Sequence, residues 1–255
     1  MKLCAIYNVW GDYDLLYHSM NNIYHLVDGV IIVYSVSSNY GEKIGGIPII
    51  SDGKITAVCR EPQFRHPMNS ETDKRNFGLN VARGLGFTHF VSMDADEFYD
   101  KDEFLKAKQR FNDEPDLEGI VCQVQCYFKS PKLTIGIETT RVPFIHKLTP
   151  TIKHEFNRNY PFAWEGKQIR IDPTRSLNIN NGVKFSNKLT MHHYSWIRQD
   201  YEKKIRNSTA RANIEKSTIR QDLQLAKDGY FCNFYGKKLY TVENKFNLPE
   251  YDVVV

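Results

Sequence analysis

Short apolar segments alternate with amphipathic ones over the first hundred residues, and this alternation restricts the folds open to the chain. Residues 30–33 are apolar at four successive positions, which is typical of a strand covered on both faces in a parallel sheet. Residues 3–7 and 90–93 are similar apolar segments. Between the three strands, apolar residues recur at helical spacing at two sets of positions: Leu15, Leu16, Ile23 and Leu26, and Phe77, Val81 and Leu85. This order predicts a doubly wound α/β sheet.

The boundaries of the second helix are predicted from the residues that flank it. Ser70 or Thr72 is the expected N-cap, and Gly84 or Gly86 is the expected end. The preceding residues 37–62 are rich in Gly and Pro, so we expect short irregular strands there.

Length and composition favour a folded, soluble protein. The 255 residues suit one large domain, or one domain with a C-terminal extension. The apolar runs are far shorter than the roughly 20 residues of a membrane-spanning helix, and the first residues turn polar too quickly for a secretory signal. Five scattered cysteines favour reduced thiols, and Cys122 and Cys126 are interpreted as small apolar strand residues. We therefore expect a cytoplasmic protein, in the host cytoplasm if the source is viral.

Residues 90–98 place an acidic run directly after an apolar strand. If the strand continued, Asp94 and Asp96 would point to the same side, and their carboxylates would converge on one divalent cation. That cation would hold a diphosphate. The alternative is an acidic turn that opens the next helix, because carboxylates favour helix N-termini.

Polar residues also follow the other two strands. Tyr7 and Asn8 end the first strand, and Ser35 ends the second. In doubly wound sheets, ligands bind outside the carboxyl ends of the strands. The three strand ends together predict one ligand-binding crevice.

The formal charge of +4 is concentrated in one segment. Residues 198–220 hold seven Lys or Arg against three acidic residues. Such a segment suits nucleic acid, nucleotide phosphates or an anionic polymer, although a solvated helix surface is the common explanation of a charge run.

Three segments together resemble a GT-A nucleotide-sugar glycosyltransferase close to family 2. The first is the helix of residues 73–82 with its pair Arg75-Asn76, the second is the acidic run at residues 93–97, and the third is residues 191–198, Met-His-His-Tyr-Ser-Trp-Ile-Arg. The resemblance covers residues 1–208 and is diffuse between 100 and 190. It implies a GT-A fold, a mostly parallel sheet with flanking helices, followed by a C-terminal helical extension.

The resemblance also implies a division of the chain. Residues 1–195 would form the GT-A domain, with a nucleotide-sugar half (1–100) and an acceptor half (101–195). Residues 196–255 would form a basic helix and tail packed on that domain.

The resemblance implies a metal site for Mn²⁺ or Mg²⁺. Asp96 is the first choice for direct ligation, Asp94 is shared between the metal and the donor's ribose, and Glu97 orients a ligand or water. His193 is the expected imidazole ligand, since His192 would face the other way on an extended strand. Both histidines can equally be hydrogen-bonded core residues.

The donor is expected to be a UDP-sugar. Arg75, with Lys74 beside it, would contact the diphosphate or the base, because guanidinium groups match phosphate oxygens. Tyr7 would stack on the base and Asn8 would hydrogen-bond to it. Ser35 and Asn76 complete the set of predicted donor-binding residues. The alternative for Arg75 is helix capping and a salt bridge with Glu71.

An inverting enzyme also needs a carboxylate as general base. Glu165 is the candidate, because the aromatic residues around it would raise its pKa and provide a platform for a sugar ring. Glu155 is the reserve. Whether the enzyme inverts or retains configuration is left open.

The acceptor is not specified by these features. Hydroxymethylated DNA in a viral setting, a surface polysaccharide, a lipooligosaccharide core and a protein all remain candidates, and so does any oligomeric state. A catalytically inactive module that binds carbohydrate or nucleic acid is the alternative function, and a phosphatase with a DxD motif is a weaker one. An EF-hand loop, a Walker loop and a GxGxxG loop are excluded by the absence of their glycines.

Overall fold

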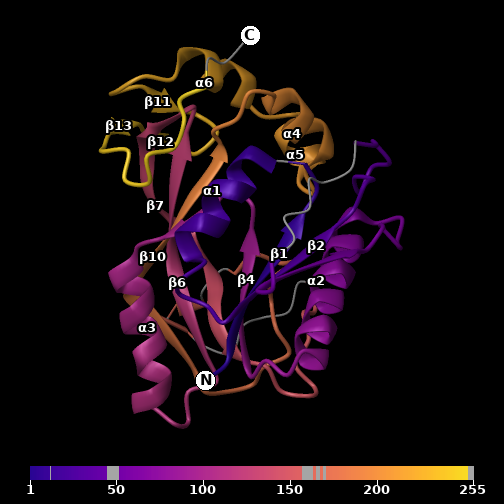
Figure 1. The fold of residues 1–255 in the computed structure, drawn as a ribbon. Coiled ribbons are helices and arrows are strands. Elements are labelled where there is room, and N and C mark those ends of the chain that lie inside the picture. Colours follow the sequence, from indigo (N-terminus) through magenta and orange to yellow (C-terminus); the bar gives the residue numbers. More distant parts are fainter. Residues whose placement is uncertain (12, 45–51, 157–162, 165–166, 169–170, 252–255) are drawn as a thin grey trace.

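The computed structural model describes residues 1–251, except residues 12, 45–51, 157–162, 165–166 and 169–170. A large curled sheet forms the centre, with helices on its sides (Figure 1). Its strands are β1 (Leu3–Val9), β2 (Gly29–Tyr34), β3 (Ile55–Cys59), β4 (His89–Asp94), β5 (Glu97–Tyr99), β6 (Gly119–Phe128), β7 (Ser130–Lys147), β10 (Val183–Trp196) and β13 (Tyr240–Thr241). The helices are α1 (Tyr13–Ile23), α2 (Pro67–Gly84), α3 (Lys101–Asp113), α4 (Tyr201–Asn207), α5 (Arg211–Ile214) and α6 (Ile219–Leu225).

The strand order within the described residues is β3-β2-β1-β4-β7-β6-β10-β5, with β13 paired to β7. The first four strands in this order are parallel. β7 runs antiparallel to both β4 and β6, and β10 is parallel to β6 but antiparallel to β5. The predicted α/β fold, with a parallel sheet over the first hundred residues and flanking helices, is confirmed.

Helices α1 and α2 cover opposite faces of the parallel strands. Tyr7 of β1 packs in the same core cluster as Leu16 of α1, whereas its neighbour Ile6 packs with Leu79 of α2. Successive side chains of a strand point to opposite faces. The strand is therefore buried on both sides, as its continuous apolar run predicts.

Helix α2 begins earlier than predicted. Its first residue is Pro67, and His66 is an N-cap without a side-chain hydrogen bond. Proline is favoured at the first helical position, because its φ angle suits a helix and its missing N–H would be unbonded there anyway. The prediction of Ser70 or Thr72 as the N-cap is wrong, and the predicted end at Gly84 is confirmed.

The acidic run does not continue the strand before it. Asp94 is the last residue of β4, a turn contains Asp96, and Glu97 opens β5. The assumed continuation of the strand is therefore wrong. The helix that follows, α3, has its own N-cap: the Asp100 carboxylate accepts backbone N–H groups at 2.9 and 3.1 Å. Because Asp100 caps α3, helix capping does not explain why Asp94, Asp96 and Glu97 are acidic.

The C-terminal part lies against the same sheet. Ile205 of α4, Ile214 of α5 and Leu223 of α6 belong to the main core cluster, and β13 extends the sheet beside β7. Two short hairpins, β8 (Ala163–Trp164) with β9 (Lys167–Gln168) and β11 (Phe231–Cys232) with β12 (Lys237–Lys238), lie outside it. The predicted helical extension is confirmed, and the domain boundary at residue 195 stays a prediction. No helix in the described ranges is long and apolar enough to cross a bilayer.

The close approach of α2 to the sheet depends on Gly78. A Cβ atom at this position would lie 2.5 Å from Ile6 Cγ2 and 3.0 Å from Val33 Cγ2. We expect Gly78→Ala to lower the free energy of unfolding by about 1–3 kcal/mol through overpacking, although Ala is the better helix former. Gly84→Ala, with nothing within 4 Å of the added Cβ, is the matched control. Urea denaturation of both variants measures the difference, and equal stability would contradict it.

Candidate active site

A cleft of about 480 Å³ lies at the carboxyl ends of β1 and β4. Its acidic lining includes Asp94, Asp96, Glu97 and Glu138, and its basic lining includes Lys74, Arg175, Arg198, Lys203 and Lys204. Asn8, Trp10, His193 and Trp196 also face it. The crevice predicted from the strand ends is therefore present, and charges of both signs line it.

Asp96 is a buried carboxylate surrounded by positive groups. Its Oδ2 atom accepts from Arg198 at 2.9 Å and from Lys204 at 3.2 Å, and its Oδ1 atom is 3.6 Å from Nε2 of His193. Burial alone would raise the pKa of Asp96. Lys204, His193 and Arg198 instead hold this pKa well below its usual value, so the carboxylate stays ionised.

Asp94 has a separate set of partners. Both of its oxygens accept from Nη2 of Arg75, at 3.0 and 3.1 Å, and Oδ2 also contacts Arg175. Burial would raise the pKa of Asp94, but Arg175 and Arg75 lower it to about 2. The side chain remains 29% exposed, so Asp94 still reaches the cleft.

Glu97 and Arg175 form a buried ion pair behind these residues. Nη1 of Arg175 donates to Oε2 of Glu97 at 3.0 Å, and Nη2 contacts the other oxygen. The same Glu97 oxygen, Oε2, accepts the backbone N–H of Asp94 at 3.0 Å. Glu97 thus orients the acidic turn, and its predicted role of orienting a ligand or water stays a prediction.

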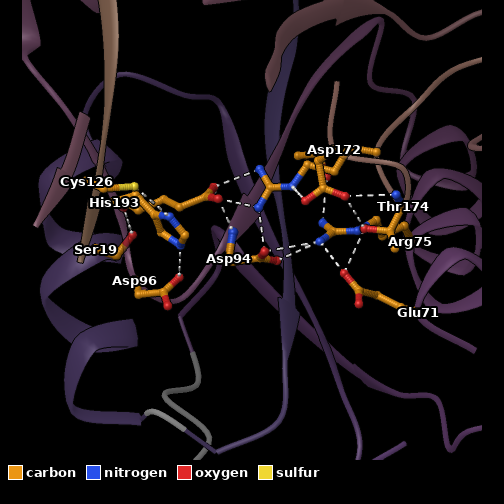
Figure 2. A network of polar contacts seen from close by, with 12 residues as sticks. Ser19, Glu71, Arg75, Asp94, Asp96, Cys126, Asp172, Thr174 and His193 are labelled. Carbon is orange, nitrogen blue, oxygen red and sulfur yellow. Dashed lines mark hydrogen bonds and ion pairs between the residues drawn. The ribbon is translucent and has the colours of Figure 1, made fainter. Parts of the chain in front are cut away.

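The ion pairs continue into a wider network (Figure 2). Glu71 accepts from Arg75 and from the Thr174 hydroxyl, at 2.8 and 2.9 Å. The Thr174 hydroxyl also contacts Asp172 at 2.8 Å. Two arginines from distant parts of the chain, Arg75 and Arg175, therefore each pair with at least two carboxylates on this side of the cleft.

The two adjacent histidines face opposite sides of β10, as predicted. His193 points to Asp96 and lies 3.7 Å from the thiol of Cys126. His192 contacts the Tyr127 hydroxyl at 2.9 Å instead. Burial would lower the pKa of His193, but Asp96 raises it.

Lys74 and Ser35 lie together at the ends of β1 and β2. The Lys74 ammonium donates to the backbone oxygen of Val9 and, at 3.1 Å, to the Ser35 hydroxyl. Lys74 has no carboxylate partner in the described ranges, and burial lowers its pKa to about 7. Lys74 and Asn8 line the cleft, whereas Ser35 reaches it only through Lys74.

Three predicted donor-binding residues have structural contacts instead. Tyr7 is fully buried, and its hydroxyl shares a hydrogen bond with Ser19 at 2.9 Å, so its ring is not available to stack on a base. Asn76 hydrogen-bonds the backbone of His154 at 2.7 and 2.9 Å. Arg75 is 2% exposed and holds Asp94 and Glu71. For Tyr7 and Asn76, and for direct phosphate contact by Arg75, the contacts contradict the prediction.

The predicted general base, Glu165, lies outside the described residues. The reserve candidate, Glu155, pairs with Lys153 at 3.0 Å and is not part of the cleft lining.

Sequence reasoning missed Arg175, because no local pattern marks it. Trp10 was also missed, although an aromatic residue three positions after Tyr7 at the same strand end was a usable signal.

The basic segment 198–220 is divided by the fold. Arg198, Lys203 and Lys204 face the cleft. Other arginines of the segment pair with nearby carboxylates: Arg206 with Glu42, Arg211 with Glu215, and Arg220 with Glu202. The segment therefore supplies cations to the cleft rather than a continuous positive surface.

The donor atoms fit a metal only in part. Asp96 Oδ1 and His193 Nε2 face each other in the cleft, 3.6 Å apart. Asp94 does not join them, since two guanidinium groups hold its oxygens, and the described residues contain no group of three or more His, Cys, Asp or Glu suited to a metal ion. Mg²⁺ sites are commonly completed by water and substrate phosphates. Asp96 and His193 thus offer two donor atoms to a divalent cation, whose other ligands would come from outside the chain.

Comparison with solved structures finds distant likenesses. Residues 1–349 of TarS from S. aureus share 12% identity at a TM-score of 0.42, over 88% of this chain and 71% of that one. The same protein in complex with UDP-GlcNAc shares 16% at 0.33, over 49% and 35%. Mannose-1-phosphate geranyltransferase from Thermus thermophilus shares 16% at 0.31, over 52% and 43%.

No family model matches the chain, and no curated protein matches it. The chain spans 35% and 43% of the TarS complex and the Thermus protein, respectively. At these identities and TM-scores, the likenesses carry no conclusion about substrate or mechanism.

Arg175 is expected to dominate the stability of the site. It neutralises Glu97 and Asp94 and is itself 2% exposed. We expect Arg175→Met to lower the free energy of unfolding by about 3–5 kcal/mol, because it leaves the buried carboxylate of Glu97 without its cationic partner. Arg211→Ala, which breaks an exposed pair with Glu215, should cost about 1 kcal/mol or less. Chemical denaturation measures the free energy of unfolding of both variants. Similar losses in the two would contradict the dominant role of Arg175 in the stability of the site.

Proposed function

We propose that the chain is a glycosyltransferase that moves a sugar from a nucleoside-diphosphate sugar to a hydroxyl acceptor. The observation that carries this proposal is the convergence of ionised Asp96, His193 and the cations Arg198 and Lys204 in one cleft at the strand ends. Sugar transfer releases a diphosphate that carries new negative charge. Cations placed where that charge develops lower the barrier.

The diphosphate is assigned to the side of the cleft lined by Arg198, Lys203 and Lys204. Lys203 and Lys204 are adjacent in α4, which begins five residues after the end of β10. Arg198 and Lys204 both bind Asp96. When the donor enters, its phosphate oxygens share these cations and are stabilised as the leaving group departs.

The nucleoside is assigned to the ends of β1 and β4. Trp10 replaces Tyr7 as the residue that stacks on the base, because it lines the cleft and Tyr7 does not. Asn8 and Lys74 offer hydrogen-bond donors beside it. Asp94, held from behind by Arg75 and Arg175, has the exposure and the charge to accept a ribose hydroxyl.

Asp96 and His193 are assigned to a Mn²⁺ or Mg²⁺ ion delivered with the donor. When bound, such an ion neutralises phosphate charge as a Lewis acid. The chain's own residues then hold the donor: Asp96 stays ionised through Arg198 and Lys204, and Glu97 orients the turn that carries it. Glu165 as general base and a UDP-sugar as donor stay predictions.

The acceptor is a second open part of this proposal. Most arginines of the basic segment pair with carboxylates of the same chain. The charge of this segment therefore gives little support to modified DNA as the acceptor. A glycan, a lipid-linked glycan and a protein hydroxyl remain candidates. The alternative function is an inactive binding module, which would bind a nucleotide sugar without breaking it.

Loss of the Asp96 charge is expected to abolish turnover. With Mn²⁺ and a panel of UDP-, GDP- and CMP-sugars, nucleotide release by Asp96→Asn should fall by on the order of 10²–10³-fold. Asp116→Asn, at an exposed loop position, is the control. EDTA should stop the wild-type reaction and Mn²⁺ should restore it. Unchanged turnover in Asp96→Asn would contradict the enzyme proposal, and insensitivity to EDTA would contradict its metal part.

Truncation of Trp10 tests the placement of the base. We expect Trp10→Ala to weaken UDP binding by about 1–3 kcal/mol, the range for stacking of one base on an aromatic ring. Tyr17→Ala removes an aromatic ring that is 53% exposed on α1 and should leave binding unchanged. Isothermal titration calorimetry gives both affinities. Equal affinities in wild type and Trp10→Ala would show that the nucleobase does not stack on Trp10 at the end of β1.

A further inference from the structure

Glu138 differs from the other carboxylates that line the cleft. Most of these are paired with cations: Glu71 with Arg75, Asp94 with Arg75 and Arg175, Asp96 with Arg198 and Lys204, and Glu97 and Asp172 with Arg175. In the described part of the chain, Glu138 and Asp200 have no such partner. Asp200 is the N-cap of α4 and accepts the backbone N–H of Lys203 at 2.7 Å. Glu138 is therefore the cleft carboxylate left without a structural charge role.

A buried thiol holds Glu138 in place. Glu138 lies on β7, and Cys126 on the adjacent β6 donates its S–H to Oε1. Cys126 is itself buried, with 1% of its surface exposed. The second oxygen, Oε2, has no hydrogen-bond partner among the described residues, and Glu138 is half-buried and open to the cleft.

The same thiol connects Glu138 to the proposed metal and diphosphate site. Cys126 lies 3.7 Å from Nδ1 of His193, and Nε2 of His193 lies 3.6 Å from Asp96. Figure 2 shows His193 between Cys126 and Asp96. Cys126 is thus the residue that lies between Glu138 and His193, and it contacts the ring nitrogen of His193 that faces away from Asp96.

Aromatic side chains surround this end of the cleft. The indole N–H of Trp196 donates to the Tyr235 hydroxyl at 2.9 Å, and the Phe234 ring centre is 6.0 Å from that of Trp196. Tyr235 and Phe234 are partly exposed and line the same cleft as Glu138, whereas Trp196 is only 4% exposed. An apolar, aromatic wall with one carboxylate suits a sugar ring, whose C–H faces pack on aromatic rings while its hydroxyls need polar partners.

We propose that Glu138 is the general base of the transfer, and that its acceptor is a sugar hydroxyl bound against Phe234 and Tyr235. This rests on the proposed glycosyltransferase function. The Glu138 carboxylate takes the hydroxyl proton as the acceptor oxygen forms a bond to the anomeric carbon of the donor. The bond from that carbon to the diphosphate oxygen breaks, and its electron pair leaves with the nucleoside diphosphate. A single displacement of this kind inverts the configuration at the anomeric carbon.

The test compares Glu138→Gln with the wild type and with Glu243→Gln, an exposed carboxylate outside the cleft. The reaction contains Mn²⁺, a UDP-sugar panel, and p-nitrophenyl glycosides or water as acceptor, and UDP release is measured. We expect Glu138→Gln to lose about 10²–10⁴-fold in turnover, the range for a general base, with UDP affinity by calorimetry unchanged. Formate should restore part of the activity of Glu138→Ala, and Glu243→Gln should match the wild type.

The outcomes distinguish failure of the Glu138 assignment from failure of the proposed glycosyltransferase function. If the wild type binds no nucleotide sugar, or binds without turnover, the glycosyltransferase function fails and Glu138 loses its role with it. If the wild type turns over and Glu138→Gln stays within a few-fold of it, the function stands and the base assignment is wrong. Loss of turnover in Glu165→Gln alone would move the role to Glu165. Retention of the anomeric configuration would also overturn the assignment.

Discussion

The placement of three carboxylates at one strand end, two of them buried, is the constraint on which the rest of the site depends. Asp94, Asp96 and Glu97 lie within four residues, and the latter two are at most 3% exposed. An ionised carboxylate without a partner is costly to bury. The fold meets this requirement with cations from distant segments: Arg75 from α2, Arg175 from the chain before β10, and Arg198 and Lys204 from the chain after it.

This requirement explains why the two halves of the sheet meet where they do. β10 is antiparallel to β5, so His193 lies opposite Glu97, and the chain that leaves β10 passes directly over Asp96. The backbone N–H of Tyr194 donates to the backbone oxygen of Asp96 at 2.8 Å. The short acidic turn is thus held by backbone pairing on one side and by ion pairs on the other, which presets its geometry before any ligand binds.

The sequence predicts those features that depend on local pattern. The apolar run of β2 indicated burial on both faces, and strand alternation separated His192 from His193. Features that depend on contacts between residues far apart in the chain could not be predicted from the sequence. Arg175 lies 78 residues from Glu97, and nothing around it in the sequence marks it. Small errors at strand ends also change the assignment of side chains: the strand break after Asp94 divides Asp94 from Asp96, and three positions separate the buried Tyr7 from Trp10 in the cleft.

The placement of Arg198 and Lys204 has a consequence for how the chain is divided. Both belong to the segment after residue 195, yet both neutralise Asp96, which lies in the N-terminal half of the sequence. A fragment that ended with β10 would retain the acidic turn and His193 but would lose Arg198 and Lys204, two of the three groups that keep Asp96 ionised. The ion pairs that stabilise the acidic turn therefore cross residue 195, and the segments on the two sides of this position depend on each other electrostatically.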